Sequence, residues 1–167
     1  MFLLNELPDK KTMEDFSKLY SEMDISTTAA CLRIFKVASV LLRELEKHFS
    51  SQGLSQARFL ALIVLEREPT KQQMPVEIAF KMGTSKKNTA RLLEFMKEDG
   101  LISIYDHESD GRASIVKINA KGAKALSKSM PGYYEIMNKA MQDLDKKSKQ
   151  SLINILDQVK LDFNNEE

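Results

Sequence analysis

Residues 83–93, GTSKKNTARLL, carry the pattern that decides the fold. A glycine that can end one helix is followed by Ser85, a residue type that caps the start of the next helix. Four residues behind this cap recur at helical spacing and are expected to face the core: Thr89, Leu92, Leu93 and Met96. Opposite this stripe, near the start of the predicted helix, lie Lys86, Lys87, Asn88, Ala90 and Arg91, of which all but Ala90 are basic or polar.

A second, shorter helix is predicted just before this one. Residues 75–82 begin with proline, which suits the first helical position, and Gly83 ends the segment. Two helices joined by such a turn form a helix-turn-helix, whose second helix contacts base edges in the major groove. Between Lys81 and Lys97 there are five basic residues and one acid, Glu94. The alternative is an ordinary solvated helix face, because a basic patch by itself is weak evidence for nucleic-acid binding.

A β-hairpin is predicted after Gly100, with strands at residues 101–105 and 113–119 and a polar turn at 106–112. The tip holds Asp110 and Arg112. A wing beside a recognition helix can reach the neighbouring minor groove, whose negative potential attracts a guanidinium. We interpret Asp110 as a carboxylate that orients Arg112, the alternative being an ordinary aspartate in a tight turn.

Amphipathic helices are expected in front of this segment. Residues 12–23 predict a helix capped by Thr12, and residues 27–49 predict a long helix with apolar residues three and four apart. Ser55 is expected to cap a further helix that runs to Leu65.

Behind the hairpin, residues 120–144 predict a connecting helix that Pro131 and Gly132 kink or interrupt. Residues 148–163 then carry an apolar stripe beyond the predicted helix-turn-helix and hairpin. This stripe therefore needs a partner, either a second chain or other helices of the same chain. Its members are Leu152, Ile155, Leu156, Val159 and Phe163.

The run from Leu54 to Gly122 resembles the MarR family of bacterial transcription regulators. The resemblance is carried by LSQARFLALIVL (54–65), PVEIAFKMGTSKKNTARLLEFMKEDGLI (75–102) and SDGRASIVKINAKG (109–122). The family order is a helix, a helix-turn-helix, GL, D-x-R in the wing and a strand leading to LT-x-x-G. The last piece reads INAKG here.

The resemblance implies a mainly α fold with a small β-hairpin wing: a winged helix-turn-helix domain plus long N- and C-terminal dimerisation helices. Residues 1–50 would form an arm and dimerisation helices, residues 51–122 the DNA-binding lobe, and residues 123–167 the C-terminal dimerisation helices. It also implies a homodimeric, sequence-specific repressor that binds a pseudo-palindromic operator in double-stranded DNA. A small-molecule effector would bind between the dimer helices and the winged lobe, where methionine, if not simply core filling, offers an adaptable lining.

By resemblance, the base and phosphate contacts fall on Ser85, Lys86, Lys87, Asn88 and Arg91. The minor-groove contact falls on Arg112, with Asp110 in support. Family members often have a basic residue where Ile104 stands and a second arginine where Gly111 stands. This wing is therefore less cationic than usual.

Composition limits the function further. The 167 residues are 43% hydrophobic and carry a net charge of +1, so they suit one domain without a global basic field. A winged-helix protein-interaction module without DNA binding is therefore the alternative function. An N-terminus with acid and proline, and the lack of a long uncharged apolar run, predict a cytoplasmic protein without a membrane segment.

Cys31 is the single cysteine, and it lies where the organic-hydroperoxide-sensing branch of the family has its reactive cysteine. Leu45 and Gln56 stand where that branch supplies tyrosines, so we expect Cys31 to be buried and inert, with redox sensing as the alternative. Two histidines and one cysteine make no convincing zinc set, and no catalytic motif is present. We expect no enzyme activity, no cofactor and no metal.

Overall fold

The computed structural model describes residues 6–107 and 110–160, without the side chains of residues 107–113. Its N-terminal helices, α1 (Lys10–Leu19) and α2 (Ile25–Ser51), are capped by aspartates. The carboxylate of Asp9 accepts from the Thr12 amide at 2.7 Å, and that of Asp24 from the Thr27 amide at 2.6 Å. The prediction that Thr12 caps the first helix is wrong, because Thr12 lies inside the first turn and its amide donates to Asp9. The long helix predicted over residues 27–49 is confirmed, and it begins two residues earlier.

The winged lobe contains α3 (Gln56–Glu66), β1 (Gln72–Gln73), α4 (Pro75–Met82), α5 (Lys86–Glu98), β2 (Ile102–His107) and β3 (Asp110–Ile118). The predicted helices and their caps at Ser55 and Ser85 are confirmed. The strands form an antiparallel sheet in the order β1-β3-β2. The sequence did not indicate β1, because a strand of two glutamines shows no period.

The hairpin turn is shorter than predicted. Asp106 pairs with Ser114, and His107 pairs with Asp110 after an irregularity in the register. Residues 106–107 and 110–112 therefore belong to strands, although their polar composition is typical of a turn.

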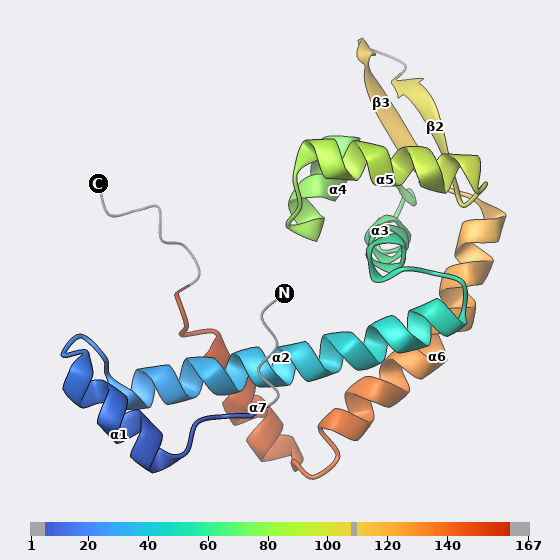
Figure 1. Ribbon diagram of the computed structural model, residues 1–167. Coiled ribbons are helices and arrows are strands. Elements are labelled where there is room, and N and C mark those ends of the chain that lie inside the picture. The colour runs from blue at the N-terminus through green and yellow to red at the C-terminus, as the bar shows by residue number, and fades with distance from the viewer. Residues whose placement is uncertain (1–5, 108–109, 161–167) are drawn as a thin grey trace.

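The core surrounds α3, whose Phe59, Leu62 and Leu65 are fully buried. Helices α4 and α5 cover it together with the base of the sheet, and Figure 1 shows α3 nearly end-on between α5 and α2. Phe49 of α2 stacks on Phe59 with ring centroids 4.1 Å apart, and Tyr133 lies 5.1 Å from Phe59. These rings join the long helices to the lobe, so α5 has a fixed position relative to them.

Helix α6 (Ala120–Ala140) leads from the wing along α2, and α7 (Lys146–Leu156) follows it. Pro131 lies inside α6 without ending it, so of the two predicted outcomes the interruption is excluded and the kink stays a prediction. Proline lacks an N–H and costs one helical hydrogen bond. Packing against α2 holds this segment, where the His48 ring lies 2.9 Å from the Ser129 carbonyl.

Large apolar side chains are exposed on the helices that lie farthest from the winged lobe in Figure 1. They come from α1, the first half of α2 and α7, and α7 has no buried residue. The predicted C-terminal stripe is exposed except for the half-buried Leu152, and its last member, Phe163, lies outside the described residues. The large exposed apolar residues here are Phe16, Leu19, Ile34, Phe35, Val37, Val40, Ile153, Ile155 and Leu156.

Helix α2 is also long and apolar enough to cross a membrane, judged by length and composition. An 18-residue window in it has a mean hydropathy of 1.6, and 6% of that window is buried. The sequence-based prediction that the chain has no such segment is therefore not confirmed. The helix also carries Arg33 and Lys36, and a charge at a bilayer centre costs about 2.5–3.5 kcal/mol on insertion scales.

Candidate nucleic-acid interface

Local interactions hold the turn between α4 and α5. Gly83 has φ 62°, the left-handed conformation that suits glycine after a helix end. The next amide, that of Thr84, donates to the Ala79 carbonyl at 3.1 Å. Ser85 then caps α5 by accepting from the Asn88 amide at 3.2 Å. These hydrogen bonds fix the orientation of α5 relative to α4.

Helix α5 buries the face that its periodicity predicts. Thr89, Leu93 and Met96 have exposures of 1%, 1% and 0%, and Leu92 is partly buried. The opposite face is in solvent, and it includes Ser85, Lys86, Lys87, Asn88 and Arg91. In Figure 1, α5 lies across the outer side of the lobe beside the wing strands. Three cations therefore lie over a helix start, where the helix dipole itself favours anions.

Lys81 does not belong to this free cationic group, although the sequence placed it there. Its Nζ lies 2.5 Å from the Oε1 of Glu68, at the end of the α3 region. Lys97 is exposed but stands at the far end of α5. The group that faces solvent at the helix start, here called the basic front, is Lys86, Lys87 and Arg91.

Phe95 is a residue that the sequence reasoning missed. It is 45% exposed, one turn after Arg91, and the guanidinium carbon of Arg91 lies 5.6 Å from its ring centroid. An arginine over an aromatic face gains about 0.5–1 kcal/mol at an exposed site. The sequence could have predicted this contact, because an arginine and an aromatic residue four positions apart on a helix are neighbours.

The wing residues are described only in part. The backbones of Asp110 and Arg112 lie in β3, while their side chains lie outside the described part of the chain. The predicted minor-groove contact of Arg112, and its orientation by Asp110, stay predictions.

The base of the wing is tied to α5 and α6. Arg58 on α3 pairs with Asp99 at 2.5 Å, and the Lys121 ammonium donates to the Asp99 carbonyl at 2.7 Å. Gly122 is the last residue of INAKG, and a Cβ there would lie 2.2 Å from the Leu101 carbonyl oxygen. The glycine is therefore required where α6 starts against the end of α5.

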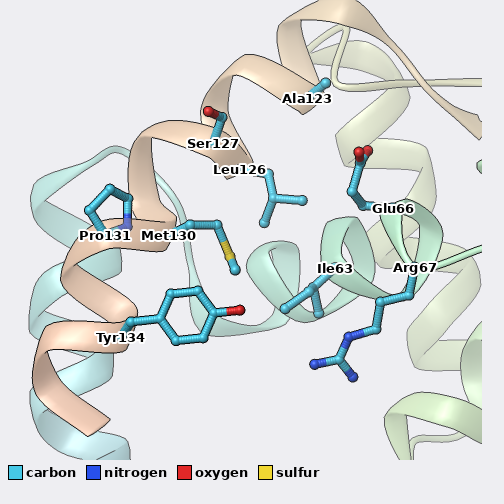
Figure 2. A pocket seen from close by; sticks show the side chains of 9 residues that line it. All are labelled: Ile63, Glu66, Arg67, Ala123, Leu126, Ser127, Met130, Pro131 and Tyr134. Carbon is cyan, nitrogen blue, oxygen red and sulfur yellow. The ribbon is translucent and has the colours of Figure 1, made fainter. Parts of the chain in front are cut away.

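A cavity of about 500 Å³ lies between α3 and α6, the region expected for an effector (Figure 2). It is mainly apolar, and Met130 is the one methionine among its lining residues. This cavity therefore lacks the lining of several methionines that was expected for an effector site. The lining residues are Ile63, Glu66, Arg67, Ala123, Leu126, Ser127, Met130, Pro131 and Tyr134.

Cys31 is exposed on α2, so the prediction that it is buried is wrong. The reason is that the first half of α2 has few neighbours within the chain. Among the residues that the structure describes, no three His, Cys, Asp or Glu side chains are grouped as a metal site.

Known proteins similar to this chain are transcription regulators. The chain is 23% identical over 153 residues to the HTH-type transcriptional repressor YetL of Bacillus subtilis, covering 92% of each. It is 27% identical over 139 residues to the transcriptional repressor MprA of Escherichia coli, covering 83% of this chain and 75% of that protein. No protein-family model matches the chain.

Among solved structures, a MarR family transcriptional regulator from Streptomyces coelicolor in complex with DNA has a TM-score of 0.75 at 17% identity. The match covers 81% of this chain and 86% of that one. A match over 81% of this chain is longer than the winged lobe alone, and it establishes the fold.

Proposed function

Because the chain has the winged-helix fold of MarR family regulators, we propose that it is a sequence-specific, DNA-binding transcriptional repressor. In this proposal it acts as a homodimer in the cytoplasm and is released from DNA by a small-molecule effector. The observation that carries the proposal is the basic front of α5, which is exposed on a helix whose opposite face is locked in the core.

The exposed face of α5 has the chemistry that reads a major groove. Lys86 and Lys87 can neutralise phosphates, which supplies affinity without sequence preference. Asn88 and Arg91 have the side chains that bind adenine and guanine edges in a bidentate manner. Ser85 caps the helix and lies beside the same front. The predicted contact of Arg112 would add the minor groove.

The apolar surface on α1, α2 and α7 supports a dimer. Exposed apolar patches of this extent are typical of interaction surfaces. Helix-turn-helix dimers read half-sites about 34 Å apart, so a rigid frame must hold their recognition helices at that spacing. Helices α2 and α6 pack along each other and join that surface to the lobe. An effector would then act by preferring a dimer whose spacing does not fit DNA.

A salt titration of DNA binding tests the proposal. The protein is titrated with duplex fragments from its own promoter region at several salt concentrations, followed by Lys86→Ala/Lys87→Ala. We expect a steep loss of affinity with salt, and a slope lower by about 0.9 for each phosphate contact removed. Lys97→Ala is the matched control, because it removes a lysine from the far end of the same helix.

Two results would contradict DNA binding by this surface. One is an affinity for duplex DNA that does not change with salt. The other is a Lys86→Ala/Lys87→Ala variant whose affinity depends on salt as steeply as that of the parent protein. A chain that shifts no genomic fragment and yet captures a stable protein partner would instead support the alternative, a winged-helix protein-interaction module.

A further inference from the structure

We propose that the cavity between α3 and α6 binds a cationic amphiphile, an apolar molecule with a protonated amine, whose N–H donor binds Glu66. We further propose that the ion pair of Glu66 with Lys71 couples an occupied cavity to the wing. The regulatory part of this inference rests on the proposed function, whereas the ligand preference does not.

Glu66 has an oxygen that lacks a partner. Its Oε1 lies 2.6 Å from the Lys71 ammonium. Its Oε2 is buried and has no hydrogen-bond partner among the described residues, although the Glu66 side chain as a whole is 35% exposed. A buried polar atom without a partner destabilises the fold, so a donor that reaches it gains more than an ordinary surface contact does. Figure 2 shows Glu66 extending from α3 toward the α6 residues that line the cavity.

The rest of the cavity suits the apolar part of such a molecule. Ile63, Leu126 and Met130 form the wall beyond Glu66, and the hydroxyl of Tyr134 is directed toward Ile63 (Figure 2). At about 500 Å³ the cavity is within the size range of small-molecule sites. An apolar lining with one carboxylate favours an apolar cation over a neutral hydrocarbon.

Arg67 is the competing charge in this cavity, because it would favour an anion. It is exposed at the C-terminal end of α3, so water screens its guanidinium. The Glu66 Oε2 is out of contact with water, and electrostatic attraction is stronger there. Glu66 therefore sets the preferred charge of the ligand.

Lys71 connects Glu66 to the wing. It directly precedes β1, and its carbonyl accepts from the Ile118 amide of β3 at 3.3 Å. Next to it, Gln72 pairs with Lys117 and Gln73 with Val116, so β1 holds the base of the wing strand. Lys71 also has φ 53°, a left-handed conformation that is strained for a residue other than glycine. The ion pair with Glu66 helps to hold this conformation.

A bound ammonium would compete with Lys71 for the same carboxylate. Two cations around one carboxylate repel each other, so occupancy of the cavity weakens the Lys71 pair and loosens β1 against β3. By linkage, loss of the Lys71 charge should make the cation bind more tightly.

Ligand preference is tested with two probes that share an indole and differ in charge, tryptamine and indole-3-propionate. Their affinities for the full chain without DNA are measured by calorimetry or by NMR titration. We expect tryptamine to bind about ten-fold more tightly, the factor for one charge-assisted hydrogen bond. Glu66→Gln should remove this preference, while Arg67→Gln, the matched change on the opposite charge, should preserve it.

Coupling is tested with Lys71→Met, which keeps the aliphatic stem and removes the charge. We expect it to bind tryptamine about three-fold or more tightly and to lose hydrogen-exchange protection at the β1–β3 amides. Lys81→Met is the matched control, because it breaks the similar pair with Glu68, which does not line the cavity. Unchanged tryptamine affinity and unchanged protection in Lys71→Met would overturn the coupling.

Equal binding of the two probes, tighter binding of indole-3-propionate, or no binding of either would overturn the ligand class. These measurements need no DNA, so they separate this inference from the proposed function. A chain that binds promoter DNA but shows no tryptamine preference refutes the inference alone. A chain that prefers tryptamine but binds no DNA refutes the proposed function and leaves the ligand preference standing.

Discussion

Single residues decide how closely the backbones of this protein approach one another. At Gly122, the start of α6 comes so near the Leu101 carbonyl that a methyl group would overlap it, at 2.2 Å. At Gly132, the obstacle is the His48 ring, also at 2.2 Å. The two positions look alike in sequence, but a backbone carbonyl cannot move aside as a side chain can.

Gly122→Ala should therefore destabilise the protein by about 1–3 kcal/mol or more, because overlap with backbone forces α6 away from the lobe. Denaturant unfolding measures this. Gly132→Ala is the matched control. Adding His48→Ala to this variant should recover much of the stability that Gly132→Ala loses, because the obstructing ring is gone. Equal stability of Gly122→Ala and the parent would show that α6 does not lie this close to Leu101.

Asp24 shows a single-residue effect that depends on pH. Its carboxylate accepts from the Ser26 hydroxyl at 2.7 Å and from the Thr27 amide at 2.6 Å. These bonds, that of Ser26 first, lower the pKa of Asp24 from its ordinary 3.8 to about 2. Because the pKa is lowered on folding, the stabilisation is complete above the unfolded pKa and is lost as the pH falls toward 2.

An NMR titration of the Asp24 carboxyl should accordingly show a midpoint near 2. In Ser26→Ala the midpoint should move up toward 3.8, since the largest cause of the shift is gone. A parent midpoint at 3.8 would mean that the carboxylate does not cap α2 in solution.

At the level of elements, α5 combines two faces with different tasks. The buried face fixes its position, and the exposed face presents the basic front. Phe95 belongs fully to neither face. It is close enough to contact Arg91, and it is too exposed to contribute much to the core. We interpret it as a positioning residue for the Arg91 guanidinium.

Phe95→Leu should lower affinity for promoter DNA about two- to five-fold, because the cation–π contact is worth about 0.5–1 kcal/mol. The dependence on salt should stay as in the parent, since no charge is lost. Arg91→Ala is the comparison, and it should lower affinity further and reduce the slope if Arg91 contacts a phosphate. A Phe95→Leu variant with parent affinity, or with a changed slope, would contradict a positioning role.

At the scale of the whole molecule, the chain has one well-packed end and one open end. The winged lobe shares its core with the last turns of α2 and with α6. The outer end, made of α1, the first half of α2 and α7, exposes aromatic and branched apolar side chains. The homodimer that we propose would cover this surface and would hold two copies of α5 at a fixed separation.

If the proposed dimer forms through this surface, Ile155→Asp should convert it to a monomer, because Ile155 is 61% exposed in the single chain and would be buried between two copies. Sedimentation measures the mass in solution. Lys149→Asp introduces the same acid on another side of α7 and should leave the dimer intact. A parent protein that sediments as a monomer would refute the dimer without testing DNA contact by α5.

The sequence by itself determined the elements that depend on neighbours along the chain. Periodicity and caps predicted α3, α4 and α5 with their limits, the hairpin, and the face that α5 shows to solvent. These signals are local, because a cap acts within one turn and an amphipathic stripe repeats every few residues.

The tertiary structure alone decided the rest. It added β1, paired Lys81 with Glu68, exposed Cys31, and left one buried oxygen of Glu66 free at the cavity. Each of these results depends on which distant segments meet, or fail to meet, in space. A local pattern has no information about such contacts, because the free energy of a pair depends on its separation and on the water removed around it.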